Sequence, residues 1–388
     1  MISPLTSSPE DRAGAVLTVD LAALVENWRR LKRKAGAACD MGAVVKADAY
    51  GLGLAPVARA LKDAGCATFY VAHLDEAVAL RGIIGPSPRI VCMHGPTPGR
   101  TERDFAAHNV IPVLSTAEHI KAWRKFAVAA DVLMESMIQI DTGMNRLGLT
   151  AREFTTHMDD PEGFLGLHPL ALMSHLACAD TPSHPLNRLQ QERFASALAT
   201  FRTKFGDAKG SLANSAGILL GPAWHYDFAR PGIALYGARA TIDGPAWPTV
   251  PVVRLAARIL QVRRVDAAAP VGYGATVQAP DGAKLATVSM GYADGLLRAA
   301  SPGGSGVLDG FKVPILGRVS MDLTTFDVSL VPESSAVPGA FIEVIGAAHT
   351  VDDLAREAGT VGYEILTALG ARFHRRYLPA PPPSARTS

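Results

Sequence analysis

The sequence predicts an α/β fold made of a (β/α)8 barrel of the TIM type, followed by a mainly antiparallel β domain. Two observations support this prediction. Short apolar runs alternate with helix-like segments about eight times over roughly 200 residues, which is the pattern of a parallel sheet that closes into a barrel. Beyond Ala240 the alternation stops, and short strands separated by Gly and Pro continue toward the C-terminus, as in antiparallel sheets.

The barrel elements follow in order along the chain. A short strand over 15–19 leads to Asp20, a favourable helix N-cap, and apolar residues then recur at helical spacing from Leu21. The next apolar run ends at Lys46 and is the first of eight strand candidates. The other seven are 68–72, 89–93, 110–114, 132–140, 170–175, 210–212 and 226–229. Helix candidates between them are 54–63, 74–81, 101–108, 116–126, a short one near Glu153, 184–205 and one turn after 212. An open doubly wound sheet is the alternative, but no Gly-x-Gly-x-x-Gly motif follows the first strand.

The second domain follows a linker-like segment at 242–251. We expect the barrel over 15–245, with 15–19 able to pair with the second domain, and the β domain over 246–378. Its strand candidates are 252–265, 275–278, 284–290, 312–316, 321–328 and 341–345, and its helix candidates are 351–358 and 363–371. Residues 1–14 and the Pro-rich 379–388 are predicted to be flexible tails.

Charge and cysteine usage exclude several classes of protein. The 38 basic and 36 acidic residues leave a formal charge of +2 without a long basic run, which argues against nucleic-acid or membrane-surface binding. No apolar stretch approaches a membrane span, and no secretory signal is recognisable. Four cysteines without CxxC spacing suit a reducing compartment, so we expect a cytoplasmic protein. The histidines lack metal-ligand spacing, so no metal site is predicted.

Lys46 is the first candidate for chemistry. It ends an apolar run, and the small, turn-prone residues Ala47 to Gly51 follow it. A lysine held at an apolar interior loses the hydration of its ammonium, so its pKa falls and the free amine can act as a Schiff-base nucleophile. The alternative is an ordinary strand-end lysine whose stem lies along apolar surface while its charge reaches water.

Polar residues also follow four other strand candidates, where barrel active sites lie. They are Gln139 to Arg146, His175, Asn214 with Ser215, and Arg230 to Ile233. The loops after the last two strands are the usual phosphate site of such barrels, and Ser215, Gly232 and Ile233 offer a hydroxyl and backbone N–H groups suited to an anion. A phosphate site beside a strand-end lysine suggests pyridoxal phosphate. Ordinary helix capping by Asn214 and Ser215 is the alternative.

Several segments, taken together and in order, resemble the alanine racemases. They are 45–51 (VKADAYG), 141–148 (DTGMNRLG), 174–177 (SHLA), 213–215 (ANS), 230–237 (RPGIALYG), 272–274 (GYG), 291–295 (GYADG), 317–322 (GRVSMD) and 362–364 (GYE). The resemblance covers about residues 15 to 378, and therefore both predicted domains.

The resemblance implies an enzyme that interconverts L- and D-alanine with pyridoxal phosphate and acts as a homodimer with shared sites. Lys46 would hold the cofactor and act as one acid/base, and the partner subunit's Tyr273 would act on the opposite face. Two bases are needed because the α-proton leaves one face and returns to the other. Arg230 would face the pyridine nitrogen and make the ring a weaker electron sink than an acid would.

The resemblance also implies binding roles. Arg146 would bind the substrate carboxylate, and His175 would support Arg230 and Tyr273. The cofactor-binding set is Lys46, Tyr50, His175, Asn214, Ser215, Arg230, Gly232, Ile233 and Tyr363, and the substrate-binding set is Arg146, Met321 and Tyr292.

Two positions depart from the family pattern. Where the family usually has a lysine modified as a carbamate, this sequence has Gln139, seven residues before Arg146. We expect the Gln139 amide oxygen to orient Arg146 without carbon dioxide. Leu52 stands where the family often has His, and we expect it to alter packing below the cofactor.

Other functions stay open from the sequence. A broad-specificity amino-acid racemase would share the fold, although such enzymes tend to be exported. A non-catalytic pyridoxal-phosphate-binding barrel would resemble only the first domain, and a barrel-type decarboxylase would pair the pyridine nitrogen with an acid. D-Alanine for peptidoglycan and alanine catabolism are both compatible physiological roles.

Overall fold

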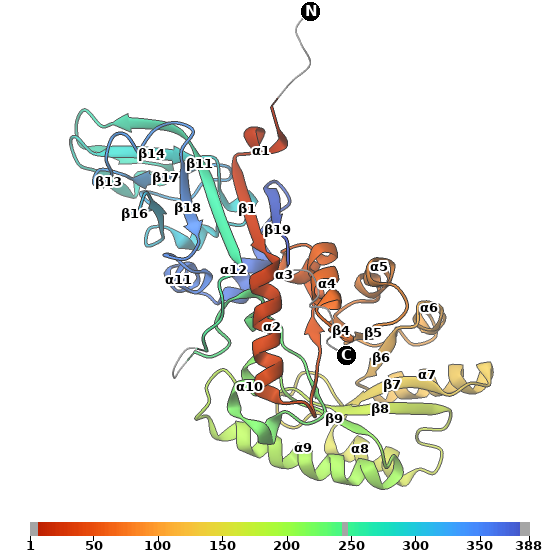
Figure 1. Ribbon diagram of the computed structural model, residues 1–388. Helices are drawn as coiled ribbons and strands as arrows, with labels where there is room; N and C mark the ends of the chain where they lie inside the picture. Colours follow the sequence, from red (N-terminus) through yellow and green to blue (C-terminus); the bar gives the residue numbers. More distant parts are fainter. Residues whose placement is uncertain (1–6, 243–246, 381–388) are drawn as a thin grey trace, which may run out of the picture.

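The computed structural model describes residues 7–242 and 247–380 and has two lobes, a barrel and an elongated β domain (Figure 1). Parts of the predicted tails and linker, residues 1–6, 243–246 and 381–388, lie outside the described residues. Within the leader predicted to be flexible, a short helix α1 (Pro9–Arg12) forms instead. Ser8 and Asp11 make a reciprocal capping box that satisfies its first N–H groups.

The barrel strands are parallel and pair in sequence order. They are β3 (Ala43–Val44), β4 (Thr68–Val71), β5 (Arg89–Cys92), β6 (Ile111–Leu114), β7 (Met134–Gln139), β8 (Leu167–Met173) and β9 (Lys209–Ser211). The last strand, β10 (Phe228–Ala229), pairs with β2 (Asp40–Met41), which only Gly42 separates from β3. The ring closes because Asp227 N donates to Gly210 O and Gly42 N donates to Ala229 O, both at 3.0 Å. The predicted barrel is therefore confirmed.

Helices follow the strands around the outside of the barrel (Figure 1). They are α2 (Leu21–Ala35), α4 (Leu54–Asp63), α5 (Leu74–Ile84), α6 (Glu102–Ala107), α7 (Ala117–Ala130), α8 (Ala151–Asp159), α9 (Pro185–Lys204) and α10 (Ser215–Leu220). The helix α2, for example, buries an apolar stripe that includes Leu24, Trp28 and Leu31. Burial of such a side chain stabilises the fold by about 1.5–3 kcal/mol.

The N-terminal strand belongs to the second lobe. β1 (Ala15–Asp20) pairs antiparallel with β11 (Val253–Arg264) and parallel with β19 (His374–Leu378). Antiparallel strands extend this sheet, namely β14 (Lys284–Val288), β15 (Ser305–Leu308), β16 (Phe311–Pro314), β17 (Thr324–Asp327) and β18 (Phe341–Ile345). A separate hairpin pairs β12 (Ala269–Val271) with β13 (Val277–Ala279), and helices α11 (Val351–Glu357) and α12 (Gly362–Ala368) complete the lobe. The second domain is therefore mainly antiparallel, as predicted.

Some elements of this lobe differ from the sequence prediction. The strand expected over 275–278 begins at Val277, because residues 273–275 form a 3-10 turn, η3 (Tyr273–Ala275). Gly272 and Gly274 flank or interrupt that turn with φ values of 72° and 77°, which an extended strand does not allow. The helix expected over 363–371 ends at Ala368. Strands β12, β15 and β19 were not predicted, since each is short and lacks a clear apolar alternation.

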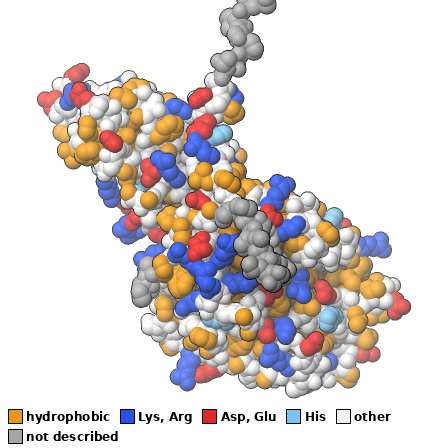
Figure 2. Space-filling view, viewed as in Figure 1, with side chains coloured by type: hydrophobic (Ala, Val, Ile, Leu, Met, Phe, Trp, Pro, Cys, Tyr) orange, Lys and Arg blue, Asp and Glu red, His pale blue; other side chains and the backbone are white. Residues whose placement is uncertain are grey.

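The two lobes meet beside the segment that follows Lys46. Arg375 Nη1 donates to Gly51 O at 2.6 Å, and the Tyr377 hydroxyl donates to Leu52 O at 3.0 Å. Leu52 itself is fully buried. Figure 2 shows basic side chains gathered on the face where the lobes join. None of the helices in the described ranges combines the length and the apolar character needed to cross a lipid bilayer.

Candidate active site

Lys46 is followed by a left-handed turn. Residues Ala47, Asp48, Ala49 and Tyr50 have φ values of 53–57°, and Gly51 continues at 79°. Non-glycine residues in this conformation cost roughly 1–2 kcal/mol each, so the surrounding structure must hold them there. One restraint is the Asp48 carboxylate, which accepts a hydrogen bond from Leu54 N at 2.7 Å. Gly51 is required because a Cβ there would lie 2.3 Å from the Leu366 carbonyl oxygen.

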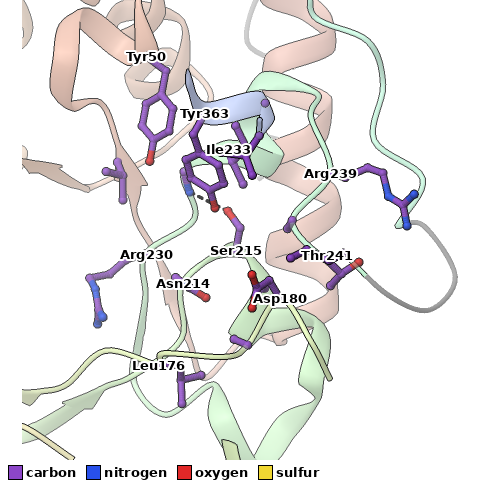
Figure 3. A pocket seen from close by; sticks show the side chains of 18 of the residues that line it. Tyr50, Leu176, Asp180, Asn214, Ser215, Arg230, Ile233, Arg239, Thr241 and Tyr363 are labelled. Atoms are coloured by element: carbon purple, nitrogen blue, oxygen red, sulfur yellow. Dashed lines mark hydrogen bonds between the residues drawn. The ribbon is translucent and has the colours of Figure 1, made fainter. Parts of the chain in front are cut away.

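A pocket opens at the carboxyl ends of the barrel strands, beside this turn. Ten predicted residues line it, which are Lys46, Tyr50, Arg146, His175, Asn214, Ser215, Arg230, Gly232, Ile233 and Tyr363. Figure 3 shows Tyr50, Tyr363 and Ser215 presenting their hydroxyls to one region, with Arg230 on another side of the pocket. The convergence expected at the strand ends is thus present in the fold.

The amine of Lys46 is adapted for nucleophilic chemistry. The side chain is half-buried, and loss of hydration lowers its pKa. The charge of Arg146 lowers the pKa further, while the Glu76 carboxylate raises it in part. The balance leaves the pKa below that of an ordinary lysine, so more of the amine is unprotonated near neutral pH.

A cradle for an anion lies in the same pocket, next to the end of this turn. Ser215 Oγ accepts hydrogen bonds from Gly232 N at 2.9 Å and Ala234 N at 3.3 Å, which joins the starts of α10 and of η2 (Ile233–Tyr236). A Cβ on Gly232 would lie 2.2 Å from the Tyr50 hydroxyl, so only glycine allows this approach.

Asn214 caps α10 by accepting a hydrogen bond from Gly217 N at 2.8 Å. The capping role considered for Asn214 is therefore real, although the residue also borders the pocket.

The two phenols of the cradle remain proton donors. The rings of Tyr50 and Tyr363 lie 6.1 Å apart between centroids, and Tyr50 also stacks on Tyr236 at 4.6 Å. Burial raises the pKa of Tyr50 and raises that of Tyr363 to about 12, and Asp180 adds to the second shift. Both hydroxyls are thus protonated at neutral pH and able to donate hydrogen bonds to an anion.

Arg230 is a buried cation whose guanidinium is held by hydrogen bonds. Its guanidinium donates to the carbonyl of Ser174 at 2.7 Å and to Ser211 Oγ at 2.5 Å. Burial lowers its pKa to about 10, which still leaves it charged at neutral pH. His175 Nδ1 lies 3.5 Å from Nη2 of Arg230. Burial, aided by the charges of Arg230 and Arg146, lowers the pKa of His175 to about 3, so this ring is neutral.

Side chains of Asp141 and Gln139 hold the loop that carries Arg146. The Asp141 carboxylate accepts from the N–H groups of residues 143–145, each at 2.8 Å. Gln139 Nε2 donates to Leu147 O at 3.2 Å, and its Oε1 accepts from Ser115 Oγ at 3.3 Å. Within the described parts of the chain no hydrogen bond joins Gln139 to Arg146. The expected contact through the amide oxygen is therefore wrong for this structure, and Gln139 instead holds the backbone next to Arg146.

Three predicted site residues lie outside this pocket. Tyr273, Tyr292 and Met321 are on the β domain and are 72%, 43% and 54% exposed. The loops of the last two are joined, because Tyr292 N donates to the Ser320 carbonyl at 3.0 Å and Ala293 N donates to that of Met321 at the same distance. One protomer therefore presents these three side chains on its surface and away from its own Lys46.

Sequence reasoning missed two polar residues near Lys46. His94 lines the pocket, and Glu76 contacts the backbone of the turn. Glu76 lies five residues beyond the end of strand β4, in the first turn of α5. An acidic residue at that position is explained by helix capping alone, so sequence reasoning had no ground to assign Glu76 to the site. No group of three or more His, Cys, Asp or Glu residues suited to a metal ion is present in the part of the chain that the structure describes.

The sequence matches two family models over most of its length. The model for the N-terminal domain of alanine racemase matches residues 19–240, and that for the C-terminal domain matches residues 252–377. The alanine racemase of Rhodospirillum rubrum is 48% identical over 368 residues, which are 95% of this chain and 97% of the relative. A catabolic alanine racemase of Mesorhizobium japonicum is 44% identical over 369 residues, covering 95% and 94% of the two chains.

Solved structures of alanine racemases are similar to this chain over both of its lobes. An alanine racemase from Bartonella henselae with covalently bound pyridoxal phosphate has a TM-score of 0.89 at 36% identity, with 94% of this chain and 100% of that chain covered. The biosynthetic enzyme of Pseudomonas aeruginosa has a TM-score of 0.85 at 36% identity, with 94% and 99% covered. Sequence, barrel, second domain and pocket agree, and the chain belongs to the alanine racemase family.

Proposed function

We propose that this chain is an alanine racemase that interconverts L- and D-alanine with pyridoxal phosphate as its cofactor. The observation that carries the proposal is one pocket that joins an amine of lowered pKa, an anion cradle and a buried guanidinium. The names of the similar proteins, and the cofactor bound in the Bartonella henselae structure, support the same assignment.

The pocket residues fit this cofactor. Nε of Arg230 has no hydrogen-bond partner among the described residues, so it is available to a ring nitrogen. The Lys46 amine would form the covalent link to the cofactor aldehyde. Bound pyridoxal phosphate supplies an electron sink that makes the α-proton of the amino acid acidic. The phosphate would be held by Tyr50, Ser215, Gly232, Ile233 and Tyr363, with Asn214 fixing the helix start beneath it.

Arg230 would also restrain the reaction. A guanidinium has donors but no acceptor, so it cannot accept a hydrogen bond from a protonated ring nitrogen in the way a carboxylate can. The ring nitrogen facing Arg230 would stay unprotonated, and electron withdrawal would be weaker. An arginine at this position would therefore favour return of the α-proton to the substrate over side reactions such as transamination. His175, neutral and next to Arg230, would hold the guanidinium without adding charge.

Two bases would move the α-proton. Lys46 Nζ would act on one face of the substrate, since it is the titratable amine beside the turn. The base proposed for the other face, Tyr273, is 72% exposed and does not line the pocket of its own protomer. We propose a homodimer in which the partner subunit's Tyr273 completes each site. The partner subunit's Tyr292 and Met321 would border the substrate with it.

Arg146 would bind the substrate carboxylate. It lines the pocket, and its charge reaches both Lys46 and His175, whose pKa values it lowers. Arg239 and Arg356 also line this pocket. Positive charge there favours the phosphate of the cofactor and the carboxylate of the substrate.

Enantiomer exchange across a panel of amino acids tests the proposal. We expect alanine to racemise fastest, and cofactor-free protein to regain activity when pyridoxal phosphate is added. If no amino acid racemises, the chain is not a racemase. If serine or lysine racemises as fast as alanine, the broad-specificity alternative is correct.

The cellular role is a separate part of the proposal. The four cysteines are free thiols, which supports a reducing compartment such as the cytoplasm. Similar proteins carry both catabolic and biosynthetic names, so supply of D-alanine to peptidoglycan and breakdown of alanine are both consistent with the family.

A further inference from the structure

The carboxylate of Glu76 joins three backbone N–H groups at the edge of the pocket. Its Oε1 accepts from Ala47 N at 2.6 Å, and its Oε2 accepts from Ala72 N at 2.8 Å and His73 N at 3.0 Å. We propose that Glu76 is a positioning residue for Lys46, which both fixes the left-handed turn and places a negative charge beside the amine. This inference rests on the proposed function of Lys46.

The bond to Ala47 acts directly on the peptide unit of Lys46. Because a peptide is planar, the Ala47 N–H and the Lys46 carbonyl share one rigid plane, and fixing the first orients the second. That plane is where the chain leaves strand geometry and enters four successive left-handed residues, 47–50. A hydrogen bond to an ionised acceptor is roughly twice as strong as a neutral one, which suits a strained position.

Glu76 is itself held in place by two elements. It lies in the first turn of α5, and Ala72 and His73 follow the end of β4. The carboxylate therefore ties the end of the first barrel strand to the end of the second and to a helix start. Tyr50 ends the same left-handed turn, so the restraint extends to a phenol of the anion cradle.

The charge of Glu76 acts on the pKa of Lys46 in the opposite direction to burial and Arg146. Burial is the main cause that lowers the pKa of Lys46, Arg146 lowers it further, and Glu76 raises it. The other titratable groups that interact with this amine are His94 and His175, and the Lys46 charge lowers the pKa of both. Glu76 is the carboxylate in this set, so removing its charge must lower the pKa of Lys46 further.

Glu76→Gln tests the proposal, because it keeps the shape, removes the charge and replaces one of the two acceptor oxygens by an NH2 donor. Cofactor-free protein is titrated with pyridoxal phosphate, and the rate of cofactor binding is followed by absorbance across a pH series. We expect affinity for pyridoxal phosphate to fall about ten-fold. We expect the midpoint of the pH dependence to move down by at least about half a unit.

Asp75→Asn is the matched control. Asp75 lies in the same first turn of α5 and carries the same charge, yet its side chain is exposed and has no hydrogen bond within the described ranges. A mere helix-capping role would make both variants less stable and leave cofactor affinity and pH midpoint as in the wild type. That result would overturn the proposal.

Glu76→Asp separates geometry from charge and serves if the glutamine variant does not fold. The shorter side chain keeps the charge but cannot reach Ala47, Ala72 and His73 together. We expect weaker cofactor binding with a pH midpoint close to that of the wild type, and wild-type affinity would refute the clamp. If the wild-type protein itself neither binds pyridoxal phosphate nor racemises alanine, the proposed function fails, whereas a wild-type-like Glu76→Gln variant defeats this inference alone.

Discussion

The side-chain nitrogen of Gln139 donates a hydrogen bond to the main-chain carbonyl of Leu147, across 3.2 Å. Leu147 follows Arg146 directly. The main-chain carbonyl of Gln139 also accepts a hydrogen bond from Leu149 N at 2.8 Å. One buried residue thus holds both the middle and the end of the loop that carries the proposed carboxylate-binding arginine.

Gln139→Ala should therefore weaken alanine binding. Loss of one buried hydrogen bond is worth about 0.5–1.5 kcal/mol, so we expect KM to rise roughly 2- to 12-fold with a smaller change in kcat. Steady-state kinetics in both directions measures this. Gln191→Ala in α9 is the control, because it removes a side-chain hydrogen bond to the Tyr226 hydroxyl at a residue that does not line the pocket, and we expect it to leave KM as in the wild type. An unchanged KM in Gln139→Ala would show that the loop is held without this residue.

The same residue predicts independence from carbon dioxide. An amide nitrogen does not form a carbamate, so added bicarbonate should change neither KM nor kcat. Removal of dissolved carbon dioxide before the assay should likewise have no effect. Stimulation by bicarbonate would mean that a lysine elsewhere takes the carbamate role.

Gly232→Ala should disrupt the anion cradle. The added Cβ would lie 2.2 Å from the Tyr50 hydroxyl, and Tyr50 cannot retreat because it is buried and stacked on Tyr236. We expect affinity for pyridoxal phosphate to fall at least about ten-fold, since the cost of overpacking is about 1–3 kcal/mol. Gly82→Ala in α5 meets nothing within 4 Å and serves as the control. Equal affinity in the two variants would contradict the cradle assigned here.

His175 should make the folded protein sensitive to acid. Its folded pKa is about 3 and its ordinary value 6.5, so the unfolded chain binds this proton first as the pH falls. Above pH 6.5 both states are neutral and the residue has no effect. Below it, folding stability should fall by up to about 1.4 kcal/mol per pH unit until pH 3 is reached.

Urea unfolding at a series of pH values checks this prediction. His175→Gln removes the titrating group, so its stability should fall less steeply between about pH 6 and pH 4 than that of the wild type. His168→Gln, at an exposed position on β8, the strand that precedes His175, is the control. Parallel slopes for wild type and His175→Gln would show that another group dominates acid unfolding.

Much of the fold was predictable because its signals are local. Alternating strand and helix patterns gave the barrel, and helix α4 and strand β18 occur at the expected residues. Strand β19 could not be found this way, since it pairs with β1 across the whole chain and carries charged residues. Long-range pairing of this kind depends on tertiary packing and not on local propensity.

The candidate site divides in the same manner. Polar residues at strand ends can be read from the sequence, because parallel strands bring their carboxyl ends together. The left-handed turn at 47–50 cannot, since Ala and Tyr do not favour that conformation and tertiary contacts impose it. Gln139 shows the same limit, because its sequence position does not reveal which atom of the amide faces the loop.

The shared site gives the sharpest prediction for the assembly. Lys46→Ala and Tyr273→Phe should each abolish most racemase activity as homodimers. If each site combines Lys46 of one protomer with the partner subunit's Tyr273, a mixed dimer of the two variants contains one site with both residues intact. Random pairing makes about half of the dimers mixed, and half of their sites active, so co-expression should restore about a quarter of wild-type activity per total site. Co-expression of Lys46→Ala with the double variant is the control and should restore none. Absence of recovery in stable mixed dimers would place both bases in one chain and refute the shared site, because a site built within a single protomer would be damaged in every subunit of the mixture.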